Sequence, residues 1–131
     1  MIHIDPNNRM PIYRQIIQQI KLQIMSGRLQ PGQQLESVSN LSSRLAINPM
    51  TVSKAYGFLV DQEMVERRRG VGIFVAKVST KNIDQERHLI LSDARRSAAG
   101  LALQLAVPPQ DASKLLNQHL EDLQNKWSSI E

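Results

Sequence analysis

The chain of 131 residues contains no cysteine, which excludes disulfide bonds and thiolate metal ligands. It also lacks a long hydrophobic run. The most apolar stretch, residues 98–107, is interrupted by Gly100 and Gln104 and is far shorter than the roughly 20 residues that a membrane-spanning helix needs. We therefore expect a soluble, cytoplasmic protein with no membrane partner. Hydrophobic residues make up 41% of the chain, which is enough for a globular core.

Histidine is scarce as well. His3, His88 and His119 are too far apart in the sequence to share one helix face as metal ligands. The sequence shows no nucleophile elbow and no paired-carboxylate pattern. Gly70 and Gly72 do not begin a dinucleotide-binding loop, because Val75 stands where that loop needs a third glycine. We expect no metal, no other cofactor and no enzymatic activity.

Positive charge is concentrated in the front of the chain. Residues 1–77 hold 10 lysines and arginines against 5 acidic residues, whereas residues 78–131 hold 6 against 7. A basic front half beside a nearly neutral rear half indicates that a polyanion binds the front half. An ordinary solubilising surface would give the same imbalance, so the order of the structural elements has to decide between the two interpretations.

The first part of the chain predicts one helix followed by a connector. Apolar residues recur at spacings of three and four after Pro11, and Gly27 ends the pattern as a glycine after a helix does. Pro31 and Gly32 then form a turn signal, so residues 28–35 are expected to connect two helices.

Two capping residues predict the helices that follow. Ser37 can cap a short second helix that reaches about Leu45. Asn48 can cap a third helix, and proline suits the next position because it has no N–H to leave unpaired. This third helix is expected to reach about Glu63. Its inner face is expected to comprise Val52, Ala55, Tyr56 and Leu59.

A glycine hairpin is predicted after the third helix. Val65 and Arg67 on one side of Gly70 and Gly72, and Ile73 and Val75 on the other, fall at every second position, which is typical of two short strands and a tight turn. Arginines at 67, 68 and 69 crowd the rising strand. They could be a solvated edge that discourages sheet pairing, but beside a helix-turn-helix we favour contact with DNA.

Three helices and an arginine-rich hairpin in this order predict a winged helix-turn-helix domain that binds double-stranded DNA. The start of the third helix favours phosphate and presents Thr51, Ser53 and Lys54 to a major groove wide enough to admit it. The hairpin tip, with Arg69 and the small Gly70, can enter the minor groove or follow the backbone.

The rear of the chain predicts two more helices, separated by the break at Pro108 and Pro109. Each carries an apolar stripe, and two helices of this size cannot hide both stripes from water by pairing only with each other. We expect a second copy of the chain to cover them, which makes the protein a homodimer. The residues expected at this interface are Leu101, Leu105, Leu120, Leu123 and Trp127.

The predicted fold is therefore mainly α with a small β wing. Residues 1–77 are expected to form the winged helix-turn-helix domain and residues 78–83 a linker. Residues 84–131 are expected to form a two-helix dimerisation or effector segment.

Several motifs of the front domain resemble the GntR family of bacterial transcription regulators. They are Pro11-Ile12-Tyr13, Gly32, Leu35, Ser37-Val38, Asn48-Pro49, residues 51–56 and residues 68–75. The short rear segment is similar to the YtrA subfamily, whose members are homodimeric repressors often linked to transporter operons. This resemblance implies a repressor, and a two-fold dimer implies an operator that is an inverted repeat.

The resemblance also implies which residues contact DNA, since the start of the recognition helix and the wing tip both match the family pattern. The expected DNA-binding residues are Ser37, Ser39, Arg44, Asn48, Pro49, Thr51, Ser53, Lys54, Arg68, Arg69, Gly70 and Val71. This chain departs from the family at the start of the second helix, where Glu36 and Ser39 replace the usual proline and arginine. A common guanine-reading arginine is thus absent. Arg44 is a candidate to replace it, and an ordinary surface charge is the alternative.

Two other functions compete with this interpretation. A small-molecule effector could dock between the rear helices and change the spacing of the recognition helices. The leucine and alanine stripes offer few polar groups for such a pocket. An enzyme fused to this type of domain, as in the aminotransferase branch of the family, has no counterpart in these 131 residues.

Overall fold

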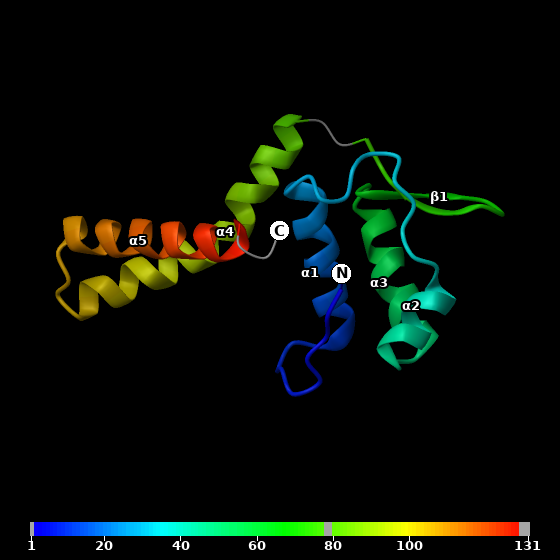
Figure 1. Ribbon diagram of the computed structural model, residues 1–131, viewed down its shortest axis with the longest axis horizontal. Coiled ribbons are helices and arrows are strands. Elements are labelled where there is room, and N and C mark those ends of the chain that lie inside the picture. Colours follow the sequence, from blue (N-terminus) through cyan, green and yellow to red (C-terminus); the bar gives the residue numbers. More distant parts are fainter. Residues whose placement is uncertain (1, 78–79, 129–131) are drawn as a thin grey trace. The chain divides into compact units, whose positions relative to one another are not determined.

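The computed structural model describes residues 2–77 and 80–128, which form five helices and one hairpin (Figure 1). The elements in chain order are α1 (Ile12–Met25), α2 (Val38–Leu45), α3 (Pro49–Asp61), β1 (Val65–Arg68), β2 (Gly72–Val75), α4 (Thr80–Gln104) and α5 (Pro109–Ser128). The chain divides into two compact units, with the boundary between Gln85 and Glu86. The predicted fold, mainly α with a small β wing, is confirmed.

The two predicted caps form as expected. The Ser37 hydroxyl accepts a hydrogen bond from the Asn40 N–H at 3.0 Å, and the Asn48 side chain accepts one from the Met50 N–H at 2.9 Å. Between α2 and α3, Ala46 adopts a left-handed conformation with φ of 55°, which makes the turn tight. These local interactions fix where α2 and α3 begin and how closely they follow one another.

Helix α3 contacts both α1 and α2 and supplies much of the core of the front unit (Figure 1). Its predicted inner face is confirmed, because none of the four side chains is more than 1% exposed. The Tyr56 hydroxyl donates a hydrogen bond to the backbone carbonyl of Glu36 at 2.7 Å. Burial, with the nearby charge of Glu36 as a smaller cause, raises the pKa of Tyr56 to about 12, so the hydroxyl keeps its proton.

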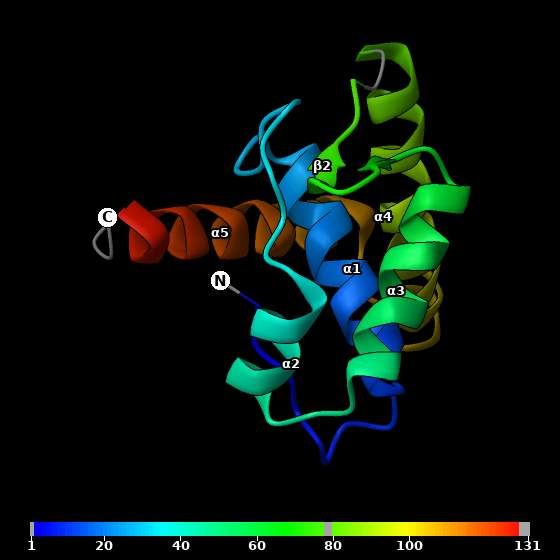
Figure 2. The same cartoon turned by 90° about the vertical axis from the view of Figure 1, so that its right-hand side faces the viewer.

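The wing contains more structure than the sequence predicted. Strands β1 and β2 pair antiparallel, with Val65 opposite Val75. The connector before α2 then runs along the other edge of β2, where the Leu35 N–H donates to the Ile73 carbonyl and the Val75 N–H donates to the Gln33 carbonyl, both at 2.8 Å (Figure 2). A segment rich in glutamine lacks the β-branched residues that mark a strand, so only the tertiary contact with β2 reveals this pairing.

The N-terminal segment is held along α1 by two glutamine side chains. The Gln15 side chain is buried and exchanges hydrogen bonds with the backbone N–H and carbonyl of Asp5, at 2.8 and 2.9 Å. One turn later, Gln19 does the same with the backbone of His3. Each glutamine amide thus pairs with the N–H and the carbonyl of one residue of the segment, as the backbone of a neighbouring strand would. Ile2 belongs to the hydrophobic core. The sequence analysis did not predict this arrangement.

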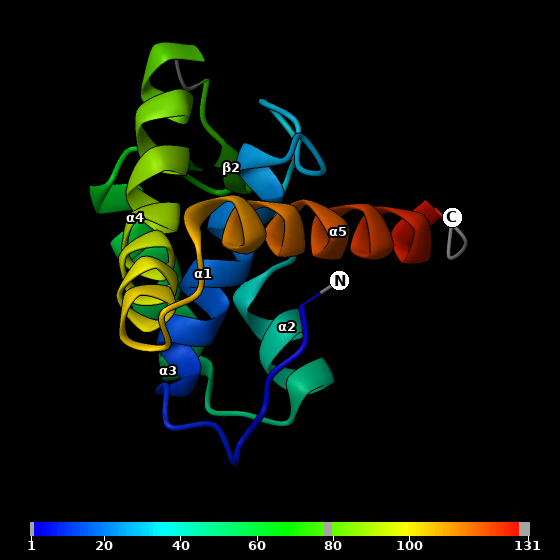
Figure 3. The ribbon, with the colours of Figure 1, turned by 90° about the vertical axis from the view of Figure 1, so that its left-hand side faces the viewer.

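The second unit consists of the rest of α4 and α5, joined through residues 105–108 (Figure 3). Helix α4 begins at Thr80, so residues 80–83, which we expected in a linker, are helical. Residues 78 and 79 of that linker lie outside the described residues. The polar residues of the predicted linker show no helical periodicity in the sequence, but the first turn of a helix tolerates polar residues. None of residues 86–126 is buried.

We expect Tyr56→Phe to lower the free energy of unfolding by about 1 to 2 kcal/mol, because the ring still packs while the Glu36 carbonyl loses its donor. Urea unfolding followed by circular dichroism measures this change. Tyr13→Phe is the matched control, since it removes the same atom from a half-buried ring whose hydroxyl interacts with the exposed Arg14 side chain, and it should cost less than about 0.5 kcal/mol. Equal losses in the two variants would contradict the role of the Tyr56 hydrogen bond.

Candidate nucleic-acid interface

The start of α3 carries the residues predicted to read DNA. Ser53 and Lys54 are exposed and Thr51 is half-buried, while the Asn48 side chain is used for the cap and Pro49 occupies the first helical position. The first turn of α3, which lies wholly within the described residues, contains no acidic side chain. The helix dipole therefore favours a phosphate at this end.

Lys54 is oriented by an aromatic ring from α1. Its Nζ lies 3.9 Å from the centroid of the Tyr13 ring, a distance at which a cation–π interaction is favourable. The neighbouring Arg14, and to a smaller extent Lys54, lower the pKa of Tyr13 below its ordinary value. Lys54 is nevertheless exposed. The ring thus restricts the position of a positive charge that remains open to a ligand.

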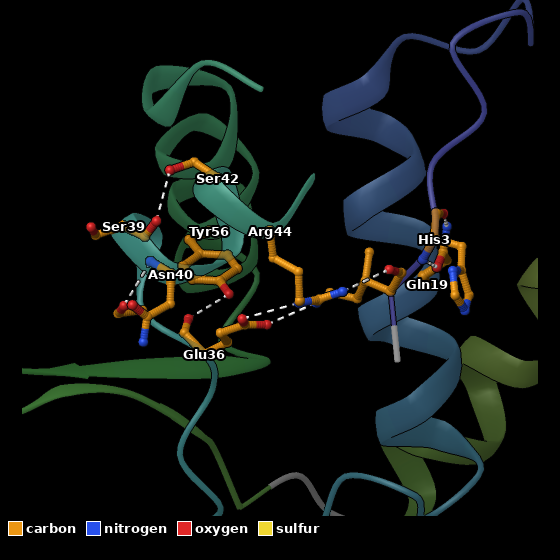
Figure 4. Close-up of polar contacts among 10 residues, drawn as sticks. His3, Gln19, Glu36, Ser39, Asn40, Ser42, Arg44 and Tyr56 are labelled. Carbon is orange, nitrogen blue, oxygen red and sulfur yellow. Dashed lines mark hydrogen bonds and ion pairs between the residues drawn. The ribbon is translucent and has the colours of Figure 1, made fainter. Parts of the chain in front are cut away.

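The start of α2 offers hydroxyl groups in place of a long basic side chain. Ser37 caps the helix, and Ser39 is exposed in the first turn while its carbonyl accepts a hydrogen bond from the Ser42 hydroxyl at 3.1 Å (Figure 4). In the described residues, the first turn of α2 also lacks acidic side chains. A serine at position 39 can reach a nearby phosphate oxygen, but it cannot replace a bidentate arginine on guanine.

The wing tip is a tight turn in which the Val71 N–H donates to the Arg68 carbonyl at 3.0 Å. The Arg68 guanidinium bonds Glu66 at 2.9 Å and lies 4.1 Å from the centroid of the Phe74 ring, so it is held along the hairpin. Arg69 and Gly70 complete the tip, where Val71 is 63% exposed. Of the predicted wing residues, Arg69 to Val71 therefore form the turn itself, whereas Arg68 belongs to β1.

Gln34, from the connector before α2, hydrogen-bonds to the wing tip. The Gln34 side-chain amide donates to the Val71 carbonyl at 3.1 Å. Gly72 has a φ of 146°, and a Cβ at that position would lie 2.6 Å from Gln34 Nε2. The backbone conformation favours glycine, whereas the close contact is with the end of a flexible side chain that an added Cβ would displace. The glycine pattern predicted the turn, but no sequence signal connected Gln34 to it.

Arg44 lies apart from the other predicted DNA-binding residues. Its guanidinium donates two hydrogen bonds to the Glu36 carboxylate, at 2.8 and 3.1 Å, and a longer one to the Ile2 carbonyl at 3.4 Å. Its side chain extends from α2 toward the N-terminal segment, on the side opposite Ser39 (Figure 4). These hydrogen bonds lower the pKa of Glu36 and raise that of Arg44. A pair eight residues apart across a helix start gives no periodic signal in the sequence.

Three places on the front unit thus collect the remaining predicted residues: the start of α2, the start of α3 and the wing tip. In Figure 1, α2 and the hairpin tip both lie on the side of α3 that faces away from α1. Among residues 2–77 and 80–128, no cluster of acidic residues and histidines could hold a metal ion. No helix in these ranges is long and apolar enough to span a membrane.

Comparison with known proteins places the front of the chain in a known family. The family described as bacterial regulatory proteins, gntR family, matches residues 12–75. The solved structure of YtrA from Sulfolobus acidocaldarius, a GntR-family transcription factor, is 35% identical in sequence with a TM-score of 0.57. The likeness covers 97% of that chain and 72% of this one. The chain belongs to the GntR family.

Other GntR relatives indicate the function of the matched region. The HTH-type transcriptional repressor YtrA of Bacillus subtilis is 44% identical over 77 residues, a match that spans 59% of this chain and 59% of that repressor. The DNA-binding domain of AraR, solved in complex with operator ORX1, is 29% identical and has a TM-score of 0.51. It covers 56% of this chain and 92% of that one. One of these proteins is named a transcriptional repressor and the other is a DNA-binding domain with its operator, which confirms the predicted family and the likeness to YtrA.

We expect Gly72→Ala to destabilise the protein by about 1 to 3 kcal/mol, because alanine strains this backbone conformation and displaces the Gln34 amide. Gly57→Ala is the matched control. Gly57 lies inside α3, and a methyl group added there would meet open space, so the same substitution should stabilise by about 0.5 to 1 kcal/mol. Thermal unfolding of both variants measures the contrast, and a change of the same sign in both would contradict the account of the wing.

Proposed function

We propose that this GntR-family protein is a sequence-specific transcriptional repressor that acts in the cytoplasm and binds an inverted-repeat operator as a homodimer. The observation that carries the proposal is the start of α3, which combines exposed Ser53 and Lys54 with Thr51 and has no acidic residue in its first turn. This surface stands in the same unit as an arginine-bearing wing. Resemblance to the YtrA subfamily favours a transporter operon as the target.

The role proposed for each interface residue follows from the chemistry of its side chain. Thr51 and Ser53 are proposed to meet base edges in the major groove, where hydroxyl groups contact more than one base. Lys54 and the start of α2 are proposed to meet phosphates, which position the protein without reading sequence. Arg69 and the wing tip are proposed to contact the minor groove or the backbone beside it. Arg68 is paired with Glu66, so it is proposed to contribute less positive charge to this contact than Arg69 does.

The proposed dimer interface rests on the exposed leucines of the second unit. Leu101, Leu105, Leu120 and Leu123 are between 53% and 71% exposed. Leu105 directly follows the last residue of α4, and the other three belong to the apolar stripes of their helices. Trp127 belongs to α5, but its side chain lies outside the described residues. Exposed stripes of this extent favour burial against another surface. A second copy offers the same stripes and closes with two-fold symmetry.

A two-fold dimer constrains the operator. It presents two α3 helices related by the symmetry axis, so each would enter one half of an inverted repeat. The half-sites would be separated by about one turn of DNA, roughly 10 base pairs, because both helices must reach the same side of the duplex.

The DNA-binding proposal is tested with duplexes selected from a random library, compared by fluorescence anisotropy with scrambled duplexes. Thr51→Ala should weaken binding to the selected duplex by about tenfold and leave the scrambled one unchanged, because it removes a base contact. Lys54→Gln should weaken both and reduce the salt slope by about one.

Lys114→Gln is the charge-matched control for Lys54, since Lys114 lies in α5 on the side away from the leucine stripe and should not alter binding. Wild-type protein with no preference among duplexes would contradict the proposed function. Unchanged binding in both the Thr51 and Lys54 variants would remove α3 as the reading element.

The dimer proposal is tested by Leu105→Glu, which should give a monomer by analytical ultracentrifugation and weaken operator binding, because a charge cannot be buried unpaired in an apolar interface. Leu103→Glu is the matched control, because Leu103 lies two residues earlier, in the last turn of α4, and is 82% exposed. It should leave the dimer intact. A dimer that survives Leu105→Glu would place the interface elsewhere.

A further inference from the structure

Glu36 is an acidic residue next to the start of α2, which belongs to the proposed DNA interface. Glu36 directly precedes Ser37, the cap of α2, and its side chain is 34% exposed. An acidic side chain near a helix start is favourable for the isolated helix, because it complements the dipole. The same charge beside a DNA phosphate is unfavourable, since like charges repel across a distance comparable to the Debye length. The described structure gives this carboxylate one cationic partner, Arg44.

The pairing between Arg44 and Glu36 is geometrically well defined. Two guanidinium nitrogens, Nε and Nη2, each donate to a different oxygen of the carboxylate, at 3.1 and 2.8 Å (Figure 4). Such a bidentate arrangement fixes the orientation of both groups. The third guanidinium nitrogen, Nη1, donates to the Ile2 carbonyl at 3.4 Å. All three nitrogens of Arg44 are therefore engaged within the protein, none of them directed toward the start of α3.

The backbone of Glu36 is anchored as well. Its carbonyl accepts the Tyr56 hydroxyl of α3, so the residue is bonded to the recognition helix through its main chain and to α2 through its side chain. Removing the charge of Glu36 as glutamine leaves the main-chain bond in place. The charge and the anchoring can therefore be separated by mutation.

We propose that Arg44 is a positioning residue that neutralises and orients Glu36 beside the DNA-facing start of α2, and that it does not itself contact DNA. This inference rests on the proposed DNA-binding function and assigns Arg44 a different role from the direct contact expected from the sequence. Both side chains are about one third exposed, so the pair adds little to folding stability. Its main effect is on the local potential that a phosphate meets.

A double-mutant cycle separates neutralisation from direct contact. Arg44→Gln uncovers the Glu36 charge and should weaken DNA binding by about two- to fivefold at low salt, whereas Glu36→Gln leaves Arg44 uncompensated and should strengthen it by a similar factor. The double variant Glu36→Gln with Arg44→Gln should return to within about twofold of wild type, because both charges are gone. If Arg44 contacted DNA directly, the double variant would stay as weak as Arg44→Gln, and the inference would be overturned.

Salt provides a second readout that a merely structural role would not move. At about 1 M salt the Debye length falls to roughly 3 Å, so the differences among the four proteins should shrink toward zero. A folding defect would persist at every salt concentration, weaken Glu36→Gln as well, and overturn the inference. Arg96→Gln, which removes one positive charge from the exposed side of α4, should bind as wild type does.

The cycle is measured on a selected and a scrambled duplex, because a charge beside a phosphate acts on both alike. Equal binding of the wild type to the selected and the scrambled duplex would contradict the proposed function. If the double variant did not regain the DNA affinity of the wild type, only the proposed role of Arg44 would be contradicted, since that comparison can be made on either duplex.

Discussion

The burial of one face of α3 is the constraint on which the rest of the front unit depends. Because Val52, Ala55, Tyr56 and Leu59 are fully enclosed by α1, α2 and the wing, the remaining face of the helix has a fixed direction. Residues between these positions, such as Ser53 and Lys54, must then point outward. The same packing attaches α2 and β1 to α3, so three segments that are proposed to touch DNA share one rigid support.

Much of this arrangement could be predicted from the sequence because it is encoded locally. Caps at Ser37 and Asn48, helical spacing of apolar residues and the glycines of the hairpin each act over a few residues, and each was found where expected. The outward positions of α3 followed from its inner face. The linker was less well predicted, since polar residues after position 79 could belong either to a loop or to the first turn of a helix.

The contacts that sequence could not predict are those between residues distant in the chain. Gln34 meets the wing tip across the pairing of the connector with β2, and Glu36, which precedes the cap of α2, meets Arg44 in the last turn of that helix. Neither pairing has a periodic signal, because the partners belong to different elements. They matter for the charge of the site, because two of the arginines counted in the sequence, Arg44 and Arg68, form ion pairs with glutamates of the same protein.

Hydrogen–deuterium exchange of the full chain, with and without a selected duplex, tests the central claim most directly. The account predicts slower exchange in residues 49–54 and 68–71 when DNA is bound, because base and phosphate contacts cover the start of α3 and the wing tip. A scrambled duplex at the same concentration should protect these segments less. Protection confined to α4 and α5, with α3 and the wing unchanged, would contradict the claim that α3 reads DNA.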